Sequence, residues 1–349
     1  MFYSNSKILF SIVFIILIFF YNKSTYSQQK EVYSWTNQIQ KINSTPVEIG
    51  TTLFQPNSLK IIDEVLILTD ASNQPSVKVF QIQEKDSLTH LHDIGKEGRG
   101  PGEYQNPWNI VDGNNEIMFY IYDSGIRRLI PYNKSFELLS NDIIQFKSQG
   151  AYTKLFNNEN KFFASGVTLQ CQFEIFDMSG DRINCIGEHP DLNLPNSSSV
   201  NPISVASRWH SYAAYNESEE KIVLFYRYAT RGSLIKFDGS PIKSIKDLQS
   251  GVPETKIVQG NLTGGNNDLR AYISVTSDSD YIYALYSGKF FRNASSSLGT
   301  FIHKFDWNLN LINVYEIDHS SIHIENVNKN ELYSIKYEPE PEIRFISLE

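Results

Sequence analysis

The sequence has no run of lysine or arginine residues, and its formal net charge is −8. Proteins gain most of their affinity for nucleic acid by neutralising phosphates, so this balance argues against a nucleic-acid partner. The chain also lacks a basic amphipathic helix that could form a patch for a membrane surface. The expected partner is therefore a protein or a small molecule.

Several motifs of common enzymes are missing as well. No Gly-x-Ser-x-Gly occurs, so a nucleophilic serine on a sharp elbow is unsupported. The glycine-rich stretch 259–268 lacks the lysine and following helix of a phosphate-binding loop and is interpreted as a flexible loop. Histidine is scarce, at seven residues, which leaves little material for a zinc site. His90 and His92 share a face of an outer strand, and His319 and His323 could meet only on a helix.

Residues 1–27 have the layout of a secretory signal peptide. A lysine precedes an apolar run of 14 residues, 8–21, and the small residues Thr25 and Ser27 precede the expected cut before Gln28. The run is shorter than the about 20 residues of a spanning helix, and an uncleaved N-terminal anchor is the alternative. There is no cysteine near the cut, so a lipid-modified N-terminus is unsupported. We expect a secreted or periplasmic protein with no membrane span after cleavage.

Long helical periodicity is missing after residue 45, whereas short runs that alternate apolar with polar residues recur to the C-terminus. Aromatic residues make up 13% of the chain and are mostly Tyr and Phe, which favour strands. Six of the runs share one pattern: an apolar strand, a polar turn and a strand rich in Ile, Leu, Phe and Tyr. Their turns fall near Asp63, Asp112, Asn157, Asn216, Asp278 and Asn328.

The spacing of these turns predicts a β-propeller. The intervals of 49, 45, 59, 62 and 50 residues average 53, enough for four strands and their loops. A four-stranded unit cannot cover its own faces, so such units stack in a ring. Residues 45–50 resemble a spare fourth strand, whose pairing with 342–349 would remove an exposed edge. We predict an all-β, six-bladed propeller with four-stranded blades over 45–349, closed by this N-terminal strand completing the last blade, with 28–44 as a lead-in.

The two cysteines, Cys171 and Cys185, flank a predicted hairpin turn at 177–181. With residue 178 at the centre of the turn they lie opposite each other, so a cross-strand disulfide is possible in an exported protein. Two buried thiols that pack as small apolar side chains are the alternative. A metal pair is disfavoured because no further ligands lie nearby.

The segment 94–133 resembles an NHL repeat. A Gly-rich turn, an acidic-aromatic pair, Asn-Pro and a closing Asp, Gly and Arg occupy the places of that family's pattern: Gly98, Gly100, Gly102, Glu103, Tyr104, Asn106, Pro107, Asp123, Gly125 and Arg128. The whole mature chain is similar to the secreted bacterial six-bladed propellers called TolB-like or NHL-like, in which "GRGPGEY" is a recurrent link between blades. The resemblance implies the fold and leaves the activity open, since such propellers include hydrolases, lyases, lactonases and binding proteins.

Links between consecutive propeller blades gather at the mouth of the central channel, where ligands usually bind. The links near 99–108, 207–212 and 269–272 carry arginines and flat aromatics, which suit a sugar face or an anionic group. The predicted ligand-binding residues are Arg99, Glu103, Trp108, Arg208, Trp209, His210, Arg270 and Tyr272. Trp209 is the expected aromatic anchor. Alternatively, Trp108 and Trp209 pack between blades while the arginines pair with acidic residues at the rim.

We therefore predict a propeller without catalysis of its own that binds a protein partner or a small ligand, sugar or anion, at the channel face. No catalytic residue, metal or cofactor is assigned. The resemblance implies one alternative, a lactonase-like hydrolase or lyase with a central Ca²⁺ held by Glu, Asn and Asp from several blades. The polar turn residues named above are interpreted as ordinary hairpin residues rather than as ligands of that ion.

Overall fold

The computed structural model describes residues 30–33, 39–72, 74–158, 160–189, 200–247, 255–265 and 268–349. The expected signal peptide, 1–27, lies outside these residues. In the described parts of the chain, no helix combines the length and the apolar character needed to cross a membrane.

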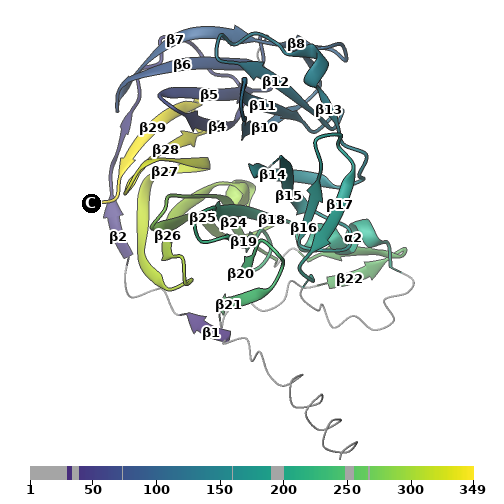
Figure 1. Cartoon of the computed structure of the whole chain (residues 1–349). Helices are drawn as coiled ribbons and strands as arrows, with labels where there is room; N and C mark the ends of the chain where they lie inside the picture. Colours follow the sequence, from purple (N-terminus) through teal and green to yellow (C-terminus); the bar gives the residue numbers. More distant parts are fainter. Residues whose placement is uncertain are drawn as a thin grey trace, which may run out of the picture.

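Strands arranged around a common centre make up most of the described chain (Figure 1). Three sheets have four strands each. They comprise β4 (Pro56–Ile62), β5 (Val65–Asp70), β6 (Val77–Glu84) and β7 (Ser87–Ile94); β10 (Pro107–Asp112), β11 (Ile117–Asp123), β12 (Arg128–Asn133) and β13 (Ile144–Gln145); and β14 (Ala151–Asn158), β15 (Lys161–Val167), β16 (Phe173–Phe176) and β17 (Arg182–Ile186).

Two sheets are larger. A five-stranded sheet contains β18 (Ser211–Asn216), β19 (Lys221–Tyr226), β20 (Arg231–Lys236), β21 (Pro241–Asp247) and β1 (Lys30–Tyr33). An eight-stranded sheet contains β24 (Leu269–Ser277), β25 (Tyr281–Phe290), β26 (Gly299–Asp306), β27 (Leu311–Asn328), β28 (Glu331–Lys336), β29 (Glu342–Ser347), β3 (Ser44–Pro46) and β2 (Ile39–Ile42). Strand β27 serves twice, because its first half pairs with β26 and its second half with β28.

Short elements lie in the connections. They are the strand pairs β8 (Lys96–Glu97) with β9 (Glu103–Tyr104) and β22 (Thr255–Val258) with β23 (Asn261–Gly264), the helix α2 (Pro202–Arg208) and the 3₁₀ turns η1 (Ser140–Asp142) and η3 (Ala294–Ser297). The stretch 259–268, predicted as a loop, thus contributes a strand. Its Gln259 and Gly260 both have positive φ and form the tight turn that allows the chain to pair with itself.

All six predicted hairpins are present as antiparallel pairs: β4–β5, β10–β11, β14–β15, β18–β19, β24–β25 and β27–β28. The predicted pairing of the N-terminal segment with the last strand is also confirmed, since Ser44, Thr45 and Pro46 lie opposite Ile346, Phe345 and Arg344. The lead-in does more than predicted. Strands β1 and β2 add in parallel to the outer strands β21 and β27, where they cover backbone groups that would otherwise form open edges.

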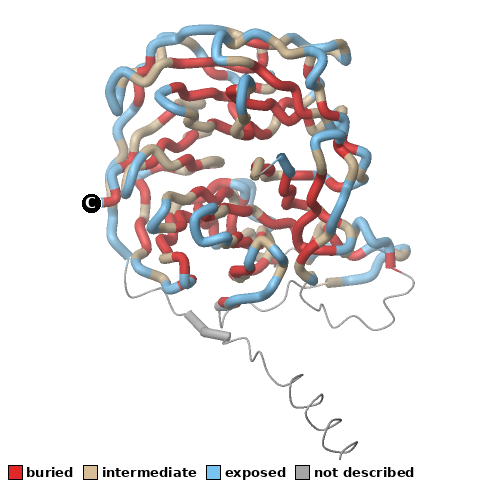
Figure 2. Tube along the Cα trace, viewed as in Figure 1, coloured by how far each residue is buried: buried red, intermediate tan, exposed pale blue. Residues whose placement is uncertain are grey.

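The apolar core is divided among clusters that lie between successive groups of strands. One joins β5 and β6 to β10 and β11 through Ile67, Val79, Ile110 and Ile121. Another joins the C-terminal strands β28 and β29 back to the first sheet. Because both faces of each sheet are covered, β5 is buried at every residue, and Figure 2 shows burial concentrated in the inner strands with exposure at the loops.

The glycine-rich link before β10 is held by one carboxylate. Asp123 is fully buried at the end of β11. It accepts backbone N–H groups from the last two residues of the link, Gln105 and Asn106, and from its own turn, Gly125 and Ile126. Gly98 and Gly102 have φ of +156° and +70°, which residues with a side chain adopt with strain. Asp70 plays the same part at the end of β5, where it accepts from the backbone of residues 54 and 55.

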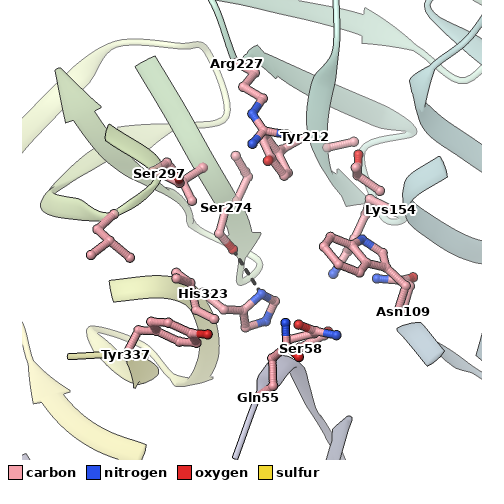
Figure 3. Close-up of a pocket in the computed structure, with 18 residues that line it drawn as sticks. Gln55, Ser58, Asn109, Lys154, Tyr212, Arg227, Ser274, Ser297, His323 and Tyr337 are labelled. Atoms are coloured by element: carbon pink, nitrogen blue, oxygen red, sulfur yellow. Dashed lines mark hydrogen bonds between the residues drawn. The ribbon is translucent and has the colours of Figure 1, made fainter. Parts of the chain in front are cut away.

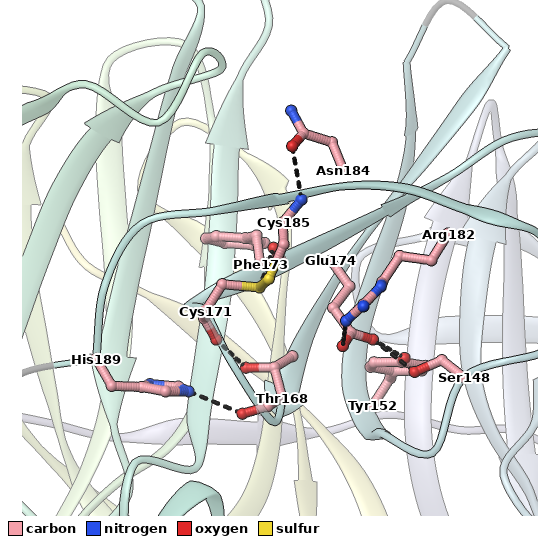
Figure 4. Close-up of a disulfide and its surroundings, with 10 residues drawn as sticks. All are labelled: Ser148, Tyr152, Thr168, Cys171, Phe173, Glu174, Arg182, Asn184, Cys185 and His189. Atoms are coloured by element: carbon pink, nitrogen blue, oxygen red, sulfur yellow. Dashed lines mark hydrogen bonds and ion pairs between the residues drawn. A yellow bond between two sulfur atoms is a disulfide. The ribbon is translucent and has the colours of Figure 1, made fainter.

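Cys171 and Cys185 form a disulfide at the outer side of the sheet β14–β17 (Figure 4). The register differs from the predicted one, because Cys185 lies opposite Glu174 while Cys171 precedes β16. The bridged residues are 14 apart, and restricting the unfolded chain by a loop of this length contributes about 3 kcal/mol in the chain-entropy model. Beside the bridge, the buried carboxylate of Glu174 accepts from Ser148 Oγ at 2.7 Å and pairs with Arg182.

Candidate functional site

A cavity of about 310 Å³ opens where the innermost strands begin (Figure 3). Its wall takes residues from β4, β10, β14, β18, β24 and β27, so it lies on the axis around which the sheets are arranged. Part of the wall is flat or apolar, formed by Trp108, Tyr212 and Tyr337. Aliphatic residues such as Ile273 and Leu298 add to this part, and the polar part of the wall includes Lys154 and Arg227. This mixture suits a small polar ligand with one flat face.

A second cavity, about 330 Å³, lies toward the other ends of the same strands. Lys154 lines both cavities, so its side chain lies between them. The turn residues Asn216 and Asp278 border the second cavity. Asn216 accepts the N–H of Glu219 and Asp278 accepts the N–H of Tyr281, as hairpin residues do.

A layer of polar side chains, one from each innermost strand, crosses the channel beside the second cavity. We call it the polar layer; its members are Lys60, Asp112, Lys154, Tyr215, Thr276 and Glu325. Lys60 Nζ lies 3.4 Å from Asp112 Oδ2 and 3.3 Å from Glu325 Oε1. Tyr215 donates toward Asp112 and Thr276 toward Glu325. Both carboxylates of the polar layer therefore contact the same ammonium group.

The two lysines of the polar layer respond to burial in opposite ways. Burial alone would lower the pKa of Lys60, but attraction to Glu325 and Asp112 overcomes it and raises the pKa above its ordinary value. Burial lowers the pKa of Lys154, and the nearby charge of Lys60 lowers it further against the opposing effect of Glu325. Among the described residues, no carboxylate lies within ion-pair distance of Lys154 Nζ. Lys154 is thus the channel cation that a ligand can contact directly.

His323 faces the first cavity but has no nitrogen free for chemistry. Its Nε2 donates to the carbonyl of Leu59 at 3.0 Å, so Nδ1 is left to accept from Ser274 Oγ at 3.4 Å (Figure 3). Burial lowers the pKa of His323 to about 4, so the ring is neutral near pH 7. A neutral imidazole with both nitrogens in hydrogen bonds orients the wall rather than moving protons.

The structure brings part of the predicted ligand-binding set together. Trp108 lines the first cavity. Arg208 and Arg270 share a neighbour, the ring of Tyr228, with their guanidinium carbons 4.9 and 5.0 Å from its centroid. His210 lies beside Arg227, with Nδ1 3.5 Å from its Nη1.

The other four predicted residues have structural contacts away from the cavity wall. Arg99 is exposed and its carbonyl accepts from Arg128, while Glu103 binds the N–H of Gly100 at 2.7 Å within the link. Trp209 is 1% exposed and packs in a cluster with Val200, Tyr226, Ala229 and Leu262. Tyr272 is buried and its hydroxyl meets His303 Nδ1 at 3.2 Å.

Two residues that the sequence analysis did not single out, Lys154 and Arg227, contribute the positive charge of the cavity. A lysine in the middle of an innermost strand, "AYTKLF", is the signal that could have indicated Lys154. Arg227 lies in the turn after β19, and its N–H donates to the carbonyl of His210 at 2.8 Å. That contact places a residue of this turn beside the link that precedes β18.

The two carboxylates of the polar layer, Asp112 and Glu325, share the ammonium of Lys60. Within the described residues, no group of three or more His, Cys, Asp or Glu side chains is arranged to hold a metal ion. His90, predicted on an outer strand, lies on β7 and contacts Asp93 at 2.9 Å, as a surface pair.

Solved structures with the same fold come from several bacteria. A Bacteroides fragilis protein inferred to be exported matches with a TM-score of 0.60 at 11% identity, covering 91% of this chain and 97% of its own. A DUF4221-family member from Bacteroides vulgatus gives 0.57 at 12%, covering 88% and 96%. The calcium-binding protein regucalcin from Agrobacterium tumefaciens gives 0.52 at 8%, covering 89% and 95%. At these identities the likeness concerns the fold alone.

No curated protein matches the sequence significantly. The model of one family, described as TolB-like 6-blade propeller-like, matches residues 37–329 and thus most of the chain. The ring of sheets, the clusters between them and the axial cavity agree with that description. The chain belongs to the TolB-like six-bladed propeller-like family.

Proposed function

We propose that this protein is an exported six-bladed propeller that binds a small ligand in its first cavity and catalyses no reaction. The observation that carries the proposal is the wall of that cavity, which combines the indole of Trp108 with Lys154, a cation that no described carboxylate contacts. An aromatic face and an unpaired cation together select a ligand with a flat or apolar side and an acceptor group.

The double use of β27 supports the proposal of six blades. Its second half, β28, β29 and β3 form a four-stranded unit of their own, and β24, β25, β26 and the first half of β27 form another. With the four other main sheets this gives six units, and the N-terminal strand β3 completes the last. Six apolar clusters between successive units support this count.

Export is supported by two independent features. The first 27 residues have the layout of a signal peptide, and the chain contains a disulfide, which persists in oxidising compartments. The Bacteroides fragilis protein of the same fold is inferred to be exported. We infer a secreted or periplasmic location from these features together.

Binding without catalysis is favoured because His323 and the two carboxylates of the polar layer are engaged in contacts with the protein itself. His323 uses both nitrogens, and the carboxylates of Asp112 and Glu325 contact Lys60. The competing function, a metal-dependent hydrolase or lyase, has one calcium-binding relative of the same fold in its favour. Elemental analysis separates the two: we expect no stoichiometric Ca, Mg or Zn, and a metal lost on mutating Asp112 or Glu325 would favour the enzyme.

Substitution of Trp108 tests the binding proposal. The purified protein is incubated with a small-molecule extract of the producing cells, washed and denatured, and the released molecules are quantified by mass spectrometry. We expect Trp108→Ala to reduce retention at least tenfold, which corresponds to about 1.4 kcal/mol. Leu91→Ala is the control, because Leu91 is 44% exposed on the outer strand β7. Equal retention by Trp108→Ala and Leu91→Ala would contradict the proposed site.

A further inference from the structure

We propose that Arg227 and Arg270, together with His210, form a receptor for a doubly charged oxyanion of the phosphate or sulfate type at the edge of the first cavity. The inference rests on the proposed function in one respect only: it identifies the anionic group of the ligand that the cavity binds. The site itself is argued from an excess of positive charge and from buried donors that lack acceptors.

Three guanidinium groups surround one aromatic ring. Their central carbons lie 4.9 Å (Arg208), 5.8 Å (Arg227) and 5.0 Å (Arg270) from the centroid of Tyr228. Like charges this close repel one another, and burial together with Arg227 lowers the pKa of Arg270. An anion bound between the guanidinium groups would relieve this repulsion, so the cluster favours anion binding.

Only one of the three arginines has an acidic partner in the described structure. Arg208 Nη2 contacts Asp268 Oδ2 at 2.6 Å, and both side chains are buried. Neither Arg227 nor Arg270 forms an ion pair with any described carboxylate. Two positive charges are therefore left without an anion. A phosphate or sulfate dianion would supply the two negative charges that balance them.

Buried donors at the same place also lack acceptors. Arg270 contacts two rings, since its guanidinium carbon also lies 4.7 Å from the centroid of Phe291. Its Nε and Nη1 are buried without a hydrogen-bond partner. A buried N–H without an acceptor is costly, whereas an oxyanion held in the plane of the guanidinium group would satisfy it.

His210 supplies a further donor of the same kind. The side chain is 9% exposed and stacks on Tyr212, which lines the cavity. A guanidinium group can only donate, so His210 Nδ1 accepts from Arg227 and the proton is carried on Nε2. Nε2 is buried and has no partner. Burial and the two arginines hold the pKa of His210 well below its ordinary value, so the ring is a neutral donor.

The backbone fixes these side chains before any ligand arrives. The turn that carries Arg227 is bonded on both sides, because its N–H donates to His210 O and its carbonyl accepts from Ala271 N, each at 2.8 Å. These two bonds join Arg227 to His210, which precedes β18, and to Ala271, which follows Arg270 on β24. Arg227 is part of the cavity wall, so an anion at this cluster is continuous with a ligand that contacts Trp108.

Calorimetric titration with sodium phosphate, sodium sulfate and sodium acetate tests the site, at constant ionic strength. We expect phosphate or sulfate to bind with one site per chain, and acetate at least tenfold more weakly. Arg270→Met and Arg227→Met should each weaken the dianion at least tenfold. The matched control is Arg292→Met, which removes the same charge from an exposed neighbour stacked only on Phe290. Arg270→Lys, which keeps the charge but loses the planar donor set, should show an intermediate loss, and unfolding curves check that each variant is folded.

Three results would overturn the inference: no dianion binding by the wild type, acetate as tight as phosphate, or an equal loss in Arg292→Met. Preference between phosphate and sulfate then identifies the anion. The outcome is separate from that of the proposed function, because retention of extracted molecules that depends on Trp108 but not on Arg270 would keep the cavity as a ligand site while rejecting the oxyanion receptor.

Discussion

Replacement of Trp209 by alanine is expected to lower the free energy of unfolding by about 4 kcal/mol, the usual cost of deleting a buried tryptophan. The side chain is 1% exposed, its ring contacts Tyr226 edge to face at 5.4 Å, and Arg231 lies over it at 5.6 Å. Truncation leaves a cavity among side chains that belong to both α2 and β19. Urea denaturation monitored by the far-ultraviolet circular dichroism of the strands measures the change.

The comparison with Trp108→Ala separates packing from binding. Trp108 is half-buried in a cavity wall, so its removal should cost about 1 kcal/mol of stability while it reduces ligand retention. If Trp209→Ala instead remained as stable as the wild type and lost the ligand, Trp209 would be the aromatic anchor that the sequence suggested. The sequence left packing between blades open as the alternative; the structure instead buries Trp209 in a cluster with residues of α2, β19 and β23.

The two lysines of the polar layer should respond to the same substitution in opposite directions. Lys60→Met removes the partner of two carboxylates, and Glu325 is only 4% exposed. Breaking a buried ion pair in this way is expected to lower the free energy of unfolding by about 3 kcal/mol, because a charge is left buried and uncompensated. Chemical denaturation at pH 7 measures it.

Lys154→Met is the matched control, with the same change of side chain in the same layer. No described carboxylate contacts Lys154, and burial lowers its pKa, so the fold gains nothing from the charge. We expect stability to remain equal or to rise by about 1 kcal/mol, while ligand retention falls, as for sites that keep a destabilised group for function. A large loss of stability in Lys154→Met would show that its charge is structural.

The pH dependence of the free energy of unfolding independently shows whether the charge of Lys154 stabilises or destabilises the fold. Between the lowered pKa of Lys154 in the folded protein and its ordinary value of 10.5, the unfolded chain holds a proton that the folded chain does not. The free energy of unfolding therefore rises with pH across that window. Lys60 has a raised pKa and contributes the opposite slope above 10.5. Subtracting the free energy of unfolding of Lys154→Met from that of the wild type isolates the contribution of Lys154. If this difference fell with rising pH, the lowered pKa of Lys154 would be contradicted.

Strand periodicity made the hairpins predictable, since it is a local property of the chain. Alternation in "SLKIIDEVLIL" is sufficient to place β4 and β5, and the pairing of residues 45–46 with the last strand followed from the need to cover an edge. The helix α2 was missed, although Asn201 caps it by accepting the N–H of Ile203 and Pro202 begins it. At seven residues it is too short to show helical periodicity.

The candidate site was only partly predictable. It depends on which residues, far apart in the sequence, lie at the same height along the central channel. Lys60 and Glu325 are separated by 265 positions, and nothing local indicates that they pair while Lys154 does not. Arg227 was missed for a related reason. Arg227 does not lie in a link that enters an innermost strand. The antiparallel hairpin returns the end of β19 to the beginning of β18 and so brings Arg227 to the same face as those links.

The most direct test of the account is a crystal structure of the protein grown with the molecules that it retains from the extract. We predict ligand density in the cavity of about 310 Å³, against Trp108 and within hydrogen-bond distance of Lys154 Nζ, with the ligand chemically unchanged. Density for the ligand on the outer strands or at the blade edges, with only water between Trp108 and Lys154, would contradict it.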